Sequence, residues 1–176
     1  DEIGGLAYRT DFDLKNHTEH SGVDLSYLDP TTNEKFVPHV LEPTFGLGRH
    51  ILAVIAKAYT EDELGGEKRV VLKFPPHLAP VKAAVFPLLK NKAELVEKAR
   101  GVYSALKKEI PQIMWDDNGN IGKRYRRQDE IGTPFCVTID FDTLADDTVT
   151  IRDRDTGVQK RIAINALPKH IRDFIS

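Results

Sequence analysis

Cysteine is almost absent from this chain, because Cys136 is the only one among its 176 residues. A single cysteine excludes an internal disulfide, and with an ordinary composition it favours a reducing cytoplasm. No apolar run approaches the roughly 18 residues of a membrane span, and no signal peptide opens the chain. We therefore expect a cytoplasmic protein with no membrane partner. The first residue, Asp1, lies in strand-like sequence without a preceding methionine, which suggests a piece of a longer protein.

Charge is divided unevenly along the chain, although the formal net charge is only -2. Residues 1–65 carry 12 acidic and 5 basic side chains, whereas residues 66–176 carry 15 acidic and 20 basic ones. Such a division suggests two modules with different partners, and the basic one is the candidate for binding a polyanion. The excess is modest, so composition alone does not establish nucleic-acid binding.

The first third of the chain predicts short strands and one helix. Residues 3–9 and 36–41 have strand-like composition, and the polar stretch 15–35 between them predicts a loop. Apolar side chains recur at helical spacing over residues 48–59. Residues 60–69 contain two adjacent glycines and six charged side chains, so they predict a linker.

The rest of the chain predicts an α/β unit with a mixed sheet of about five strands. The apolar run 81–89 suits a strand covered on both faces, and residues 113–115 and 135–139 predict two more. Two further strands, 148–152 and 158–164, alternate apolar and polar residues around a turn, which is typical of a hairpin.

Asparagines precede each helix that we expect in this unit. Asn91 can cap the first helix with Glu94 in a capping box, and Asn120 can cap the second. Asn165 can cap the closing helix. These signals predict helices on both sides of the central strands.

A carboxylate and an arginine flank a glycine-spaced turn in the segment Val40-Leu41-Glu42-Pro43-Thr44-Phe45-Gly46-Leu47-Gly48-Arg49. Glu42 should lie near the end of a core strand, where a desolvated carboxylate needs a partner: a substrate ammonium, a backbone amide or an arginine. Arg49 opens a helix against the local dipole, so it either contacts an external phosphate or pairs with a nearby acid. The spacing alone leaves these alternatives open, and for Glu42 it favours a structural partner over a substrate.

Four cations crowd the first two turns of the helix predicted after Asn120: Lys123, Arg124, Arg126 and Arg127. Cations at a helix N-terminus are unfavourable by up to about 1 kcal/mol each, which points to a polyanionic partner. Tyr125 can pack inside or stack on an unpaired base. The alternative is a solvated basic face paired with the acids around it, which include Asp116, Asp117, Asp129 and Glu130.

The segment from Glu42 to Arg49 resembles the third signature motif of class II aminoacyl-tRNA synthetases, in the form found in homodimeric glycyl-tRNA synthetases. Thr44 stands where that family has serine. The segment from Asp1 to Leu14 also resembles the catalytic sheet of this family. Residues 72–82, 122–140 and 149–154 resemble its C-terminal anticodon-binding domain. The resemblance therefore covers nearly the whole chain.

The resemblance implies residues 1–62 from the catalytic domain, a linker over 63–69 and an anticodon-binding domain over 70–176. It implies that Glu42 and Glu2 bind the ammonium of glycine and that Thr44 orients it. It also implies that Arg49 contacts an ATP phosphate.

The resemblance further implies that a homodimeric parent adenylates glycine with ATP and Mg and then esterifies tRNA(Gly). The anticodon stem-loop would be approached by Lys123, Arg124, Arg126, Arg127 and Glu130. No residue resembles a covalent nucleophile, so we assign no catalytic residue, and we expect no metal or tightly bound cofactor in this chain. The other two class II motifs have no counterpart here, so the chain alone should not aminoacylate.

Two other functions compete with this interpretation. A non-catalytic, nucleic-acid-binding accessory subunit could use the same scaffold, although it would not need Glu42 and Arg49. A flavodoxin-like nucleotide-binding enzyme would need a glycine-rich turn after residues 81–89, where the chain has Lys90-Asn91-Lys92.

Three weaker patterns favour structural roles. His17 and His20 lack the further ligands of a metal site. Cys136, between two apolar residues, is typical of a small core residue. The acids Asp140, Asp142, Asp146 and Asp147 lack the glycine and terminal glutamate of a calcium loop, so a solvated turn is favoured.

Overall fold

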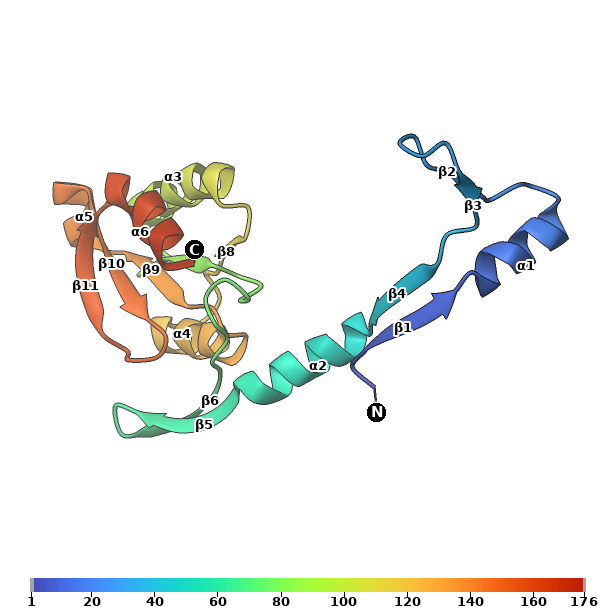
Figure 1. Ribbon diagram of the computed structural model, residues 1–176. Helices are drawn as coiled ribbons and strands as arrows, with labels where there is room; N and C mark the ends of the chain where they lie inside the picture. Colours follow the sequence, from blue (N-terminus) through green and yellow to red (C-terminus); the bar gives the residue numbers. More distant parts are fainter. Residues whose placement is uncertain (1, 176) are drawn as a thin grey trace. The chain divides into compact units, whose positions relative to one another are not determined.

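The computed structural model describes residues 2–175, which form two compact units, one ending at Ala53 and one beginning at Val54 (Figure 1). Asp1, the first residue of the segment that resembles the catalytic sheet, lies outside the described residues. No helix in the described part is both long and apolar enough to cross a membrane.

The first unit is built on a two-stranded antiparallel ribbon of β1 (Gly4–Thr10) and β4 (Val40–Phe45). Between them lie α1 (Phe12–Ser21) and a minimal hairpin of β2 (Tyr27–Leu28) and β3 (Lys35–Phe36). Helix α2 (Leu47–Ala58) follows β4 directly, close to the predicted 48–59.

The expectation of a loop over residues 15–35 was wrong where α1 forms. No residue of this helix is buried, so its sequence carries no apolar stripe that could have revealed it. An ion pair between Lys15 and Asp11, at 2.6 Å, joins successive turns, and Gly22 ends the helix in the left-handed conformation at φ 70°. Local charge pairs and a glycine stop therefore define α1.

The second unit contains the predicted mixed five-stranded sheet, in the order β11-β10-β9-β7-β8. The parallel strands are β7 (Ala83–Pro87), β8 (Ile113–Trp115) and β9 (Phe135–Ile139). The hairpin of β10 (Thr148–Asp153) and β11 (Gln159–Ala163) adds antiparallel to β9. Every residue of β7 and β9 is buried, as expected for strands covered on both faces.

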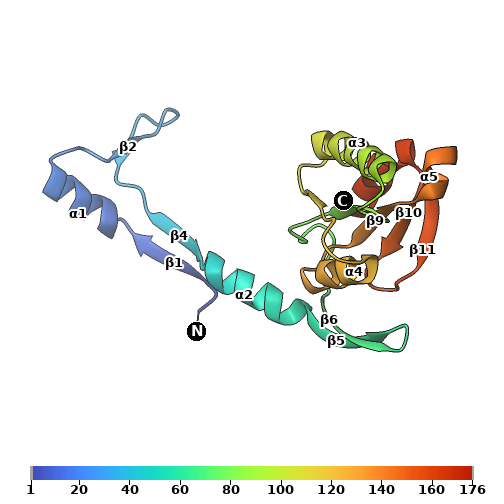
Figure 2. The same cartoon turned by 180° about the vertical axis from the view of Figure 1, so that it is seen from behind.

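Helices cover both faces of this sheet (Figures 1 and 2). On one face, α3 (Ala93–Glu109) and α6 (Leu167–Ile175) bury Leu95, Leu106 and Ile171 against alternate strand residues. On the other face, α4 (Ile121–Glu130) packs Tyr125 against a smaller apolar cluster. The unit therefore has the α/β architecture expected from its strand and helix order.

The capping predictions had mixed outcomes. The Asn120 side chain accepts a hydrogen bond from the Lys123 amide at 2.9 Å, so its capping role is confirmed. Asn91 does not cap α3, because that helix begins one residue later, after Lys92. Asn165 does not cap α6, because it lies in the 3-10 turn Ile164–Ala166 and the helix begins after this turn, at Leu167.

The stretch that we expected to be a loop-like linker is a β-hairpin. Strands β5 (Tyr59–Leu64) and β6 (Glu67–Leu72) pair along their full length. Gly65 and Gly66 take φ values of 64° and 83°, which suit a tight two-residue turn between antiparallel strands. The hairpin belongs to the second unit, where β6 lies beside α4.

Helix α5 (Phe141–Asp146) is also a correction to the expected solvated turn. Asp140 accepts hydrogen bonds from the Thr143 amide and hydroxyl, and the Thr143 hydroxyl in turn accepts one from the Asp140 amide. This reciprocal pair is a capping box built with threonine in place of the usual glutamate.

Candidate substrate site and nucleic-acid interface

One face of the β1–β4 ribbon carries the polar residues singled out in the sequence. The register places Gly5 opposite Thr44 and Ala7 opposite Glu42, so these four residues share a face. The other face is apolar and exposed, and it presents Leu6, Tyr8, Leu41 and Phe45. Because Gly5 and Ala7 are small, they leave room above β1 between the polar side chains.

Glu42 is less buried than we expected. It is the third residue of β4, its side chain is 42% exposed, and its Oε2 lies 3.1 Å from Arg9 Nη1. The expected core strand is therefore corrected: among the described residues β4 pairs only with β1, so the ribbon is not part of a larger sheet. Asp13 and Glu42 together raise the pKa of Arg9, which therefore stays charged beside the carboxylate.

Arg49 and Glu42 do not bind each other. Arg49 is the third residue of α2, it is exposed, and its Nη1 donates to the backbone carbonyl of Glu2. Within residues 2–175, no carboxylate forms an ion pair with Arg49. The Gly46 amide donates to the Ile3 carbonyl at 3.0 Å and fixes the start of α2 beside the start of β1. Arg49 is thus left with donors for an anion.

Glu2 and Thr44 converge above Gly5. A Cβ atom built on Gly5 would lie 2.5 Å from Glu2 Oε1 and 3.1 Å from Thr44 Oγ1. A carboxylate and a hydroxyl oxygen thus occupy the same small region at the end of the ribbon from which α2 starts. Oxygen acceptors placed in this way can take the hydrogen bonds of an ammonium group.

In the second unit, Arg124 does not belong to a surface interface. Its side chain is buried, with 1% of the residue exposed. Its guanidinium donates to the Pro87 carbonyl, and to the carbonyls of Asp117 and Gly119 at 3.1 and 2.8 Å. Burial lowers the pKa of Arg124 from its ordinary value. The proposed contact with RNA is therefore corrected: Arg124 ties the start of α4 to the carboxyl ends of β7 and β8.

Arg126 and Arg127 are half-exposed but already hold partners. Arg127 donates to Asp116 at 2.8 Å and to the Asn118 carbonyl at 2.6 Å. Arg126 donates to the Lys68 carbonyl at 2.7 Å and pairs with Glu67 at 3.0 Å. Their side chains remain 37% and 40% exposed, so a phosphate can still reach them.

Lys123 is exposed in the first turn of α4, and Glu130 is exposed at its last residue. Glu130 and Arg126 line a cavity of about 480 Å³ together with side chains of the β5–β6 hairpin. Tyr125, which the sequence left open, packs inside: its ring lies edge-on to Phe86, and its hydroxyl bonds the Thr138 hydroxyl at 2.7 Å.

Two exposed lysines that we did not expect in the basic surface, Lys90 and Lys92, follow β7. Parallel strands β7 and β8 end at the same edge of the sheet, and the loop of Lys90 and Lys92 and the start of α4 leave from this edge. In the described part of the chain, no hydrogen bond or ion pair engages the side chains of Lys90, Lys92 or Lys123. The signal was available, because a basic Lys-Asn-Lys run directly follows an apolar strand.

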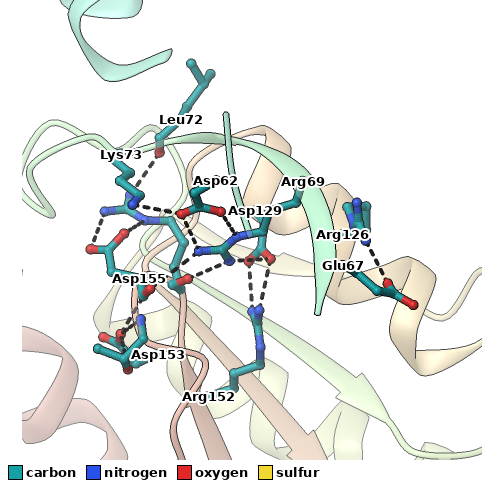
Figure 3. A network of polar contacts seen from close by, with 12 residues as sticks. Asp62, Glu67, Arg69, Leu72, Lys73, Arg126, Asp129, Arg152, Asp153 and Asp155 are labelled. Atoms are coloured by element: carbon teal, nitrogen blue, oxygen red, sulfur yellow. Dashed lines mark hydrogen bonds and ion pairs between the residues drawn. The ribbon is translucent and has the colours of Figure 1, made fainter. Parts of the chain in front are cut away.

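A buried ion network holds the β5–β6 hairpin to α4 and β10 (Figure 3). The Asp129 carboxylate, only 3% exposed, accepts from Arg69 at 2.9 Å and from Arg152 at 2.8 and 2.9 Å. Arg69 also binds Asp62 at 2.6 Å, and this hydrogen bond holds the pKa of Asp62 well below its usual range. The hairpin is therefore an integral part of the second unit.

Arg154 adds a second connection to the same hairpin. Its guanidinium donates to the carbonyls of Leu72, Phe74 and Gly132 at 3.1, 2.9 and 2.9 Å. Leu72 is the last residue of β6, Phe74 follows that strand, and Gly132 lies in the turn after α4, so the Arg154 side chain joins three segments distant in sequence.

The weaker patterns have plain structural explanations. His17 and His20 lie exposed on α1, and the described residues contain no group of three or more potential metal ligands. Cys136 is a buried core residue, as expected, and burial raises the pKa of its thiol.

The mixed sheet with helices on both faces defines a known class of domain. A family model described as "Anticodon binding domain" matches residues 82–174, which include the whole sheet, and the chain belongs to this family.

Curated relatives extend the similarity over the whole chain, and they are glycine–tRNA ligases. The chain is 55% identical to the glycine–tRNA ligase of Clostridium acetobutylicum over 175 residues, or 99% of this chain and 37% of that protein. It is 54% identical to the Caldanaerobacter subterraneus enzyme over 98% of the chain, and 52% identical to the Thermobifida fusca enzyme over 99%. The resemblance to glycyl-tRNA synthetases is thereby confirmed. The chain spans between a third and two fifths of the length of these relatives, 36–38%.

Proposed function

We propose that this chain forms part of a ligase that activates glycine with ATP and transfers it to tRNA(Gly). The main support is its identity of 52–55% to glycine–tRNA ligases across 99% of its residues. The segment from Glu42 to Arg49, with its two charged residues, lies within the matched region. Residues 1–62 would belong to the catalytic domain and residues 70–176 to the anticodon-binding domain, and the linker over residues 63–69 would lie within the β5–β6 hairpin.

In this proposal the polar face of the ribbon binds glycine. Glu42, Glu2 and the Thr44 hydroxyl offer oxygen acceptors to the α-ammonium, and on binding the ammonium replaces Arg9 as partner of Glu42. Positioning brings the glycine carboxylate to the α-phosphate of ATP for in-line attack, and such positioning can supply a large part of the rate acceleration. The full-length ligase would bind ATP with Mg and act as a homodimer in the cytoplasm. We assign no residue of this chain to the metal.

Arg49 would bind an ATP phosphate. Its exposed guanidinium, held at one end by the Glu2 carbonyl, presents its remaining donors as a planar fork that suits a phosphate. The contact gains strength where charge develops in the transition state.

The test is glycine-dependent exchange of pyrophosphate into ATP by the full-length ligase. Replacing Arg49→Ala should lower kcat/KM for ATP by about 10²-fold, as is typical for loss of one transition-state donor. Lys57→Ala, an exposed cation near the end of the same helix, is the matched control and should retain activity. An Arg49→Ala enzyme as active as wild type would refute the phosphate contact, and a wild type without glycine-dependent exchange would refute the ligase itself.

For the second unit we propose contact with the anticodon stem-loop of tRNA(Gly) through Lys123, Arg126, Arg127 and Glu130. The unpaired ammonium groups of Lys90 and Lys92 extend this surface along the same edge of the sheet. Contacts of this kind to phosphates position the RNA without reading its sequence.

This surface can be tested with the 176-residue chain itself. Lys90→Ala, Lys92→Ala and Lys123→Ala together should weaken tRNA binding and reduce the slope of log K against log salt by about 2–3. Lys108→Ala is the control, because it is an exposed lysine of α3 near the opposite edge of the sheet. An unchanged salt slope in the triple variant would move the RNA contact elsewhere on the unit.

A further inference from the structure

Gly5 occupies an unusual position for a glycine. It lies inside strand β1, where glycine is unfavourable because it adds no packing and loses more backbone freedom on folding. Its φ is not in the left-handed region, so the backbone conformation does not require a glycine there. The reason must be the space that a side chain would occupy.

That space is already filled by two polar atoms. A Cβ on Gly5 would lie 2.5 Å from Glu2 Oε1, closer than real Cβ contacts come, and 3.1 Å from Thr44 Oγ1. Thr44 is the cross-strand partner of Gly5, so strand pairing holds its backbone in place, whereas Glu2 Oε1 is the far end of a flexible side chain. A methyl group at residue 5 would therefore push the Glu2 carboxylate away from Thr44.

The neighbouring glycine provides a contrast. A Cβ on Gly4 would lie 3.2 Å from Phe45 Cδ1, on the apolar face of the ribbon, and 3.3 Å from the Thr44 main-chain carbonyl oxygen, but near neither polar side-chain atom. Gly4 thus affects packing against Phe45, and Gly5 affects only the polar face. Two adjacent glycines therefore separate structural and site-forming roles.

We propose that Gly5 is a positioning residue: because it places no side chain of its own above β1, the side chains of Glu2 and Thr44 can converge there on the ammonium of the amino-acid substrate. This inference rests on the proposed function. Ala7, the cross-strand partner of Glu42, is also small and lies on the same face as Gly5. The oxygen-bearing side chains of Glu2, Thr44 and Glu42 therefore surround two small residues. The role concerns binding of the amino acid and not of ATP, because Arg49 is held by the Glu2 backbone carbonyl, whereas a side chain at residue 5 would displace the Glu2 carboxylate.

The experiment measures pyrophosphate exchange by the full-length ligase with varied glycine and varied ATP. Gly5→Ala should raise KM for glycine about tenfold or more, because a charge-assisted hydrogen bond is lost, and leave KM for ATP unchanged. Gly4→Ala is the matched control and should change KM for glycine less than about threefold, since its Cβ meets Phe45 and the Thr44 main-chain carbonyl but not the Glu2 carboxylate or the Thr44 hydroxyl.

A double-mutant cycle tests whether Gly5 acts through Glu2. If it does, Gly5→Ala combined with Glu2→Gln should raise KM for glycine no further than Glu2→Gln alone. Independent, multiplicative effects would overturn the proposal, as would a Gly5→Ala enzyme with a normal KM for glycine. A parallel rise in both KM values with a lowered Tm would also overturn it, because that result describes a damaged fold. A wild type without glycine-dependent exchange would instead refute the proposed function.

Discussion

Replacing Asp129→Asn tests whether the buried ion network holds the second unit together. The carboxylate is almost fully buried, and Arg69 and Arg152 donate three hydrogen bonds to it at 2.8–2.9 Å. Asparagine has nearly the same shape but carries no charge, and its amide group would face guanidinium donors. Both arginines would then lose their shared counter-charge inside the protein.

The size of the expected loss in the free energy of unfolding depends on which arginine keeps a carboxylate partner. Removing one member of a buried ion pair costs about 3–5 kcal/mol, because the remaining charge is left uncompensated. Arg69 retains Asp62, at 2.6 and 3.1 Å, but the described residues offer Arg152 no other carboxylate. One arginine rather than two is therefore stranded, and we expect a loss of about 3 kcal/mol in the free energy of unfolding.

Urea unfolding followed by tryptophan fluorescence measures this loss. Trp115 is the only tryptophan and lies on β8, so the signal reports the second unit alone. The midpoint should fall with little change in the m value, because the surface exposed on unfolding is the same. Glu130→Gln, the exposed next residue on α4, is the control and should change stability by less than about 0.5 kcal/mol. A loss below about 1 kcal/mol for Asp129→Asn would refute the reasoning.

Three further changes probe other parts of the same unit. Gly132→Ala should cost at least about 2 kcal/mol in urea unfolding, because φ is +80° and the new Cβ would lie 2.5 Å from Phe74 and 2.7 Å from the Leu72 carbonyl; near-normal stability would contradict this. Asn120→Ala should cost about 1 kcal/mol by removing the cap of α4, and Asn120→Asp should retain most of it. Arg69 holds the pKa of Asp62 below its ordinary 3.8, so the stability it contributes is present above about pH 4 and is lost as pH falls further. Urea midpoints of Asp62→Asn should therefore depend less on pH below about 4 than those of wild type, and equal dependence would rule out the linkage.

The elements that could be predicted from the sequence are those whose signal is local. Strands β7 and β9 are apolar at nearly every position because both faces are covered, and the turn before β11 carries its own glycine. The Asn120 cap depends on a residue three positions away. In each case a short window of sequence contains the whole cause.

The elements that were missed depend on partners outside any short window. The β5–β6 hairpin is charged throughout much of its length, and Arg69 finds Asp129 60 residues later in the chain. Helix α1 buries no residue, so it shows no periodicity. In both cases the charged composition predicts a solvated loop, and only the fold shows where those charges are paired.

The same limit explains which site residues could be identified. Glu42, Thr44 and Arg49 belong to a contiguous motif, so their grouping was visible. The convergence of Glu2 with Thr44 depends on strand pairing between β1 and β4, and the space above Gly5 is a consequence of that register. A motif lists the side chains that are present, so it cannot show that the lack of a side chain at Gly5 has a function.

Two buried arginines and three exposed lysines of the second unit show how differently the two kinds of cation are used. A guanidinium offers five donors in one plane, which suits it to bind several carbonyls and carboxylates at once, as Arg124 and Arg154 do. An ammonium is a strongly hydrated point charge, and Lys90, Lys92 and Lys123 remain at the surface. The number of basic residues in the sequence therefore overstates the number of cationic side chains that are free to contact an RNA. An interface based on these lysines would position a phosphate backbone without reading its sequence. Discrimination among anticodon bases would then require side chains with directional donors and acceptors. The candidates are Arg126 and Glu130, which line the same cavity.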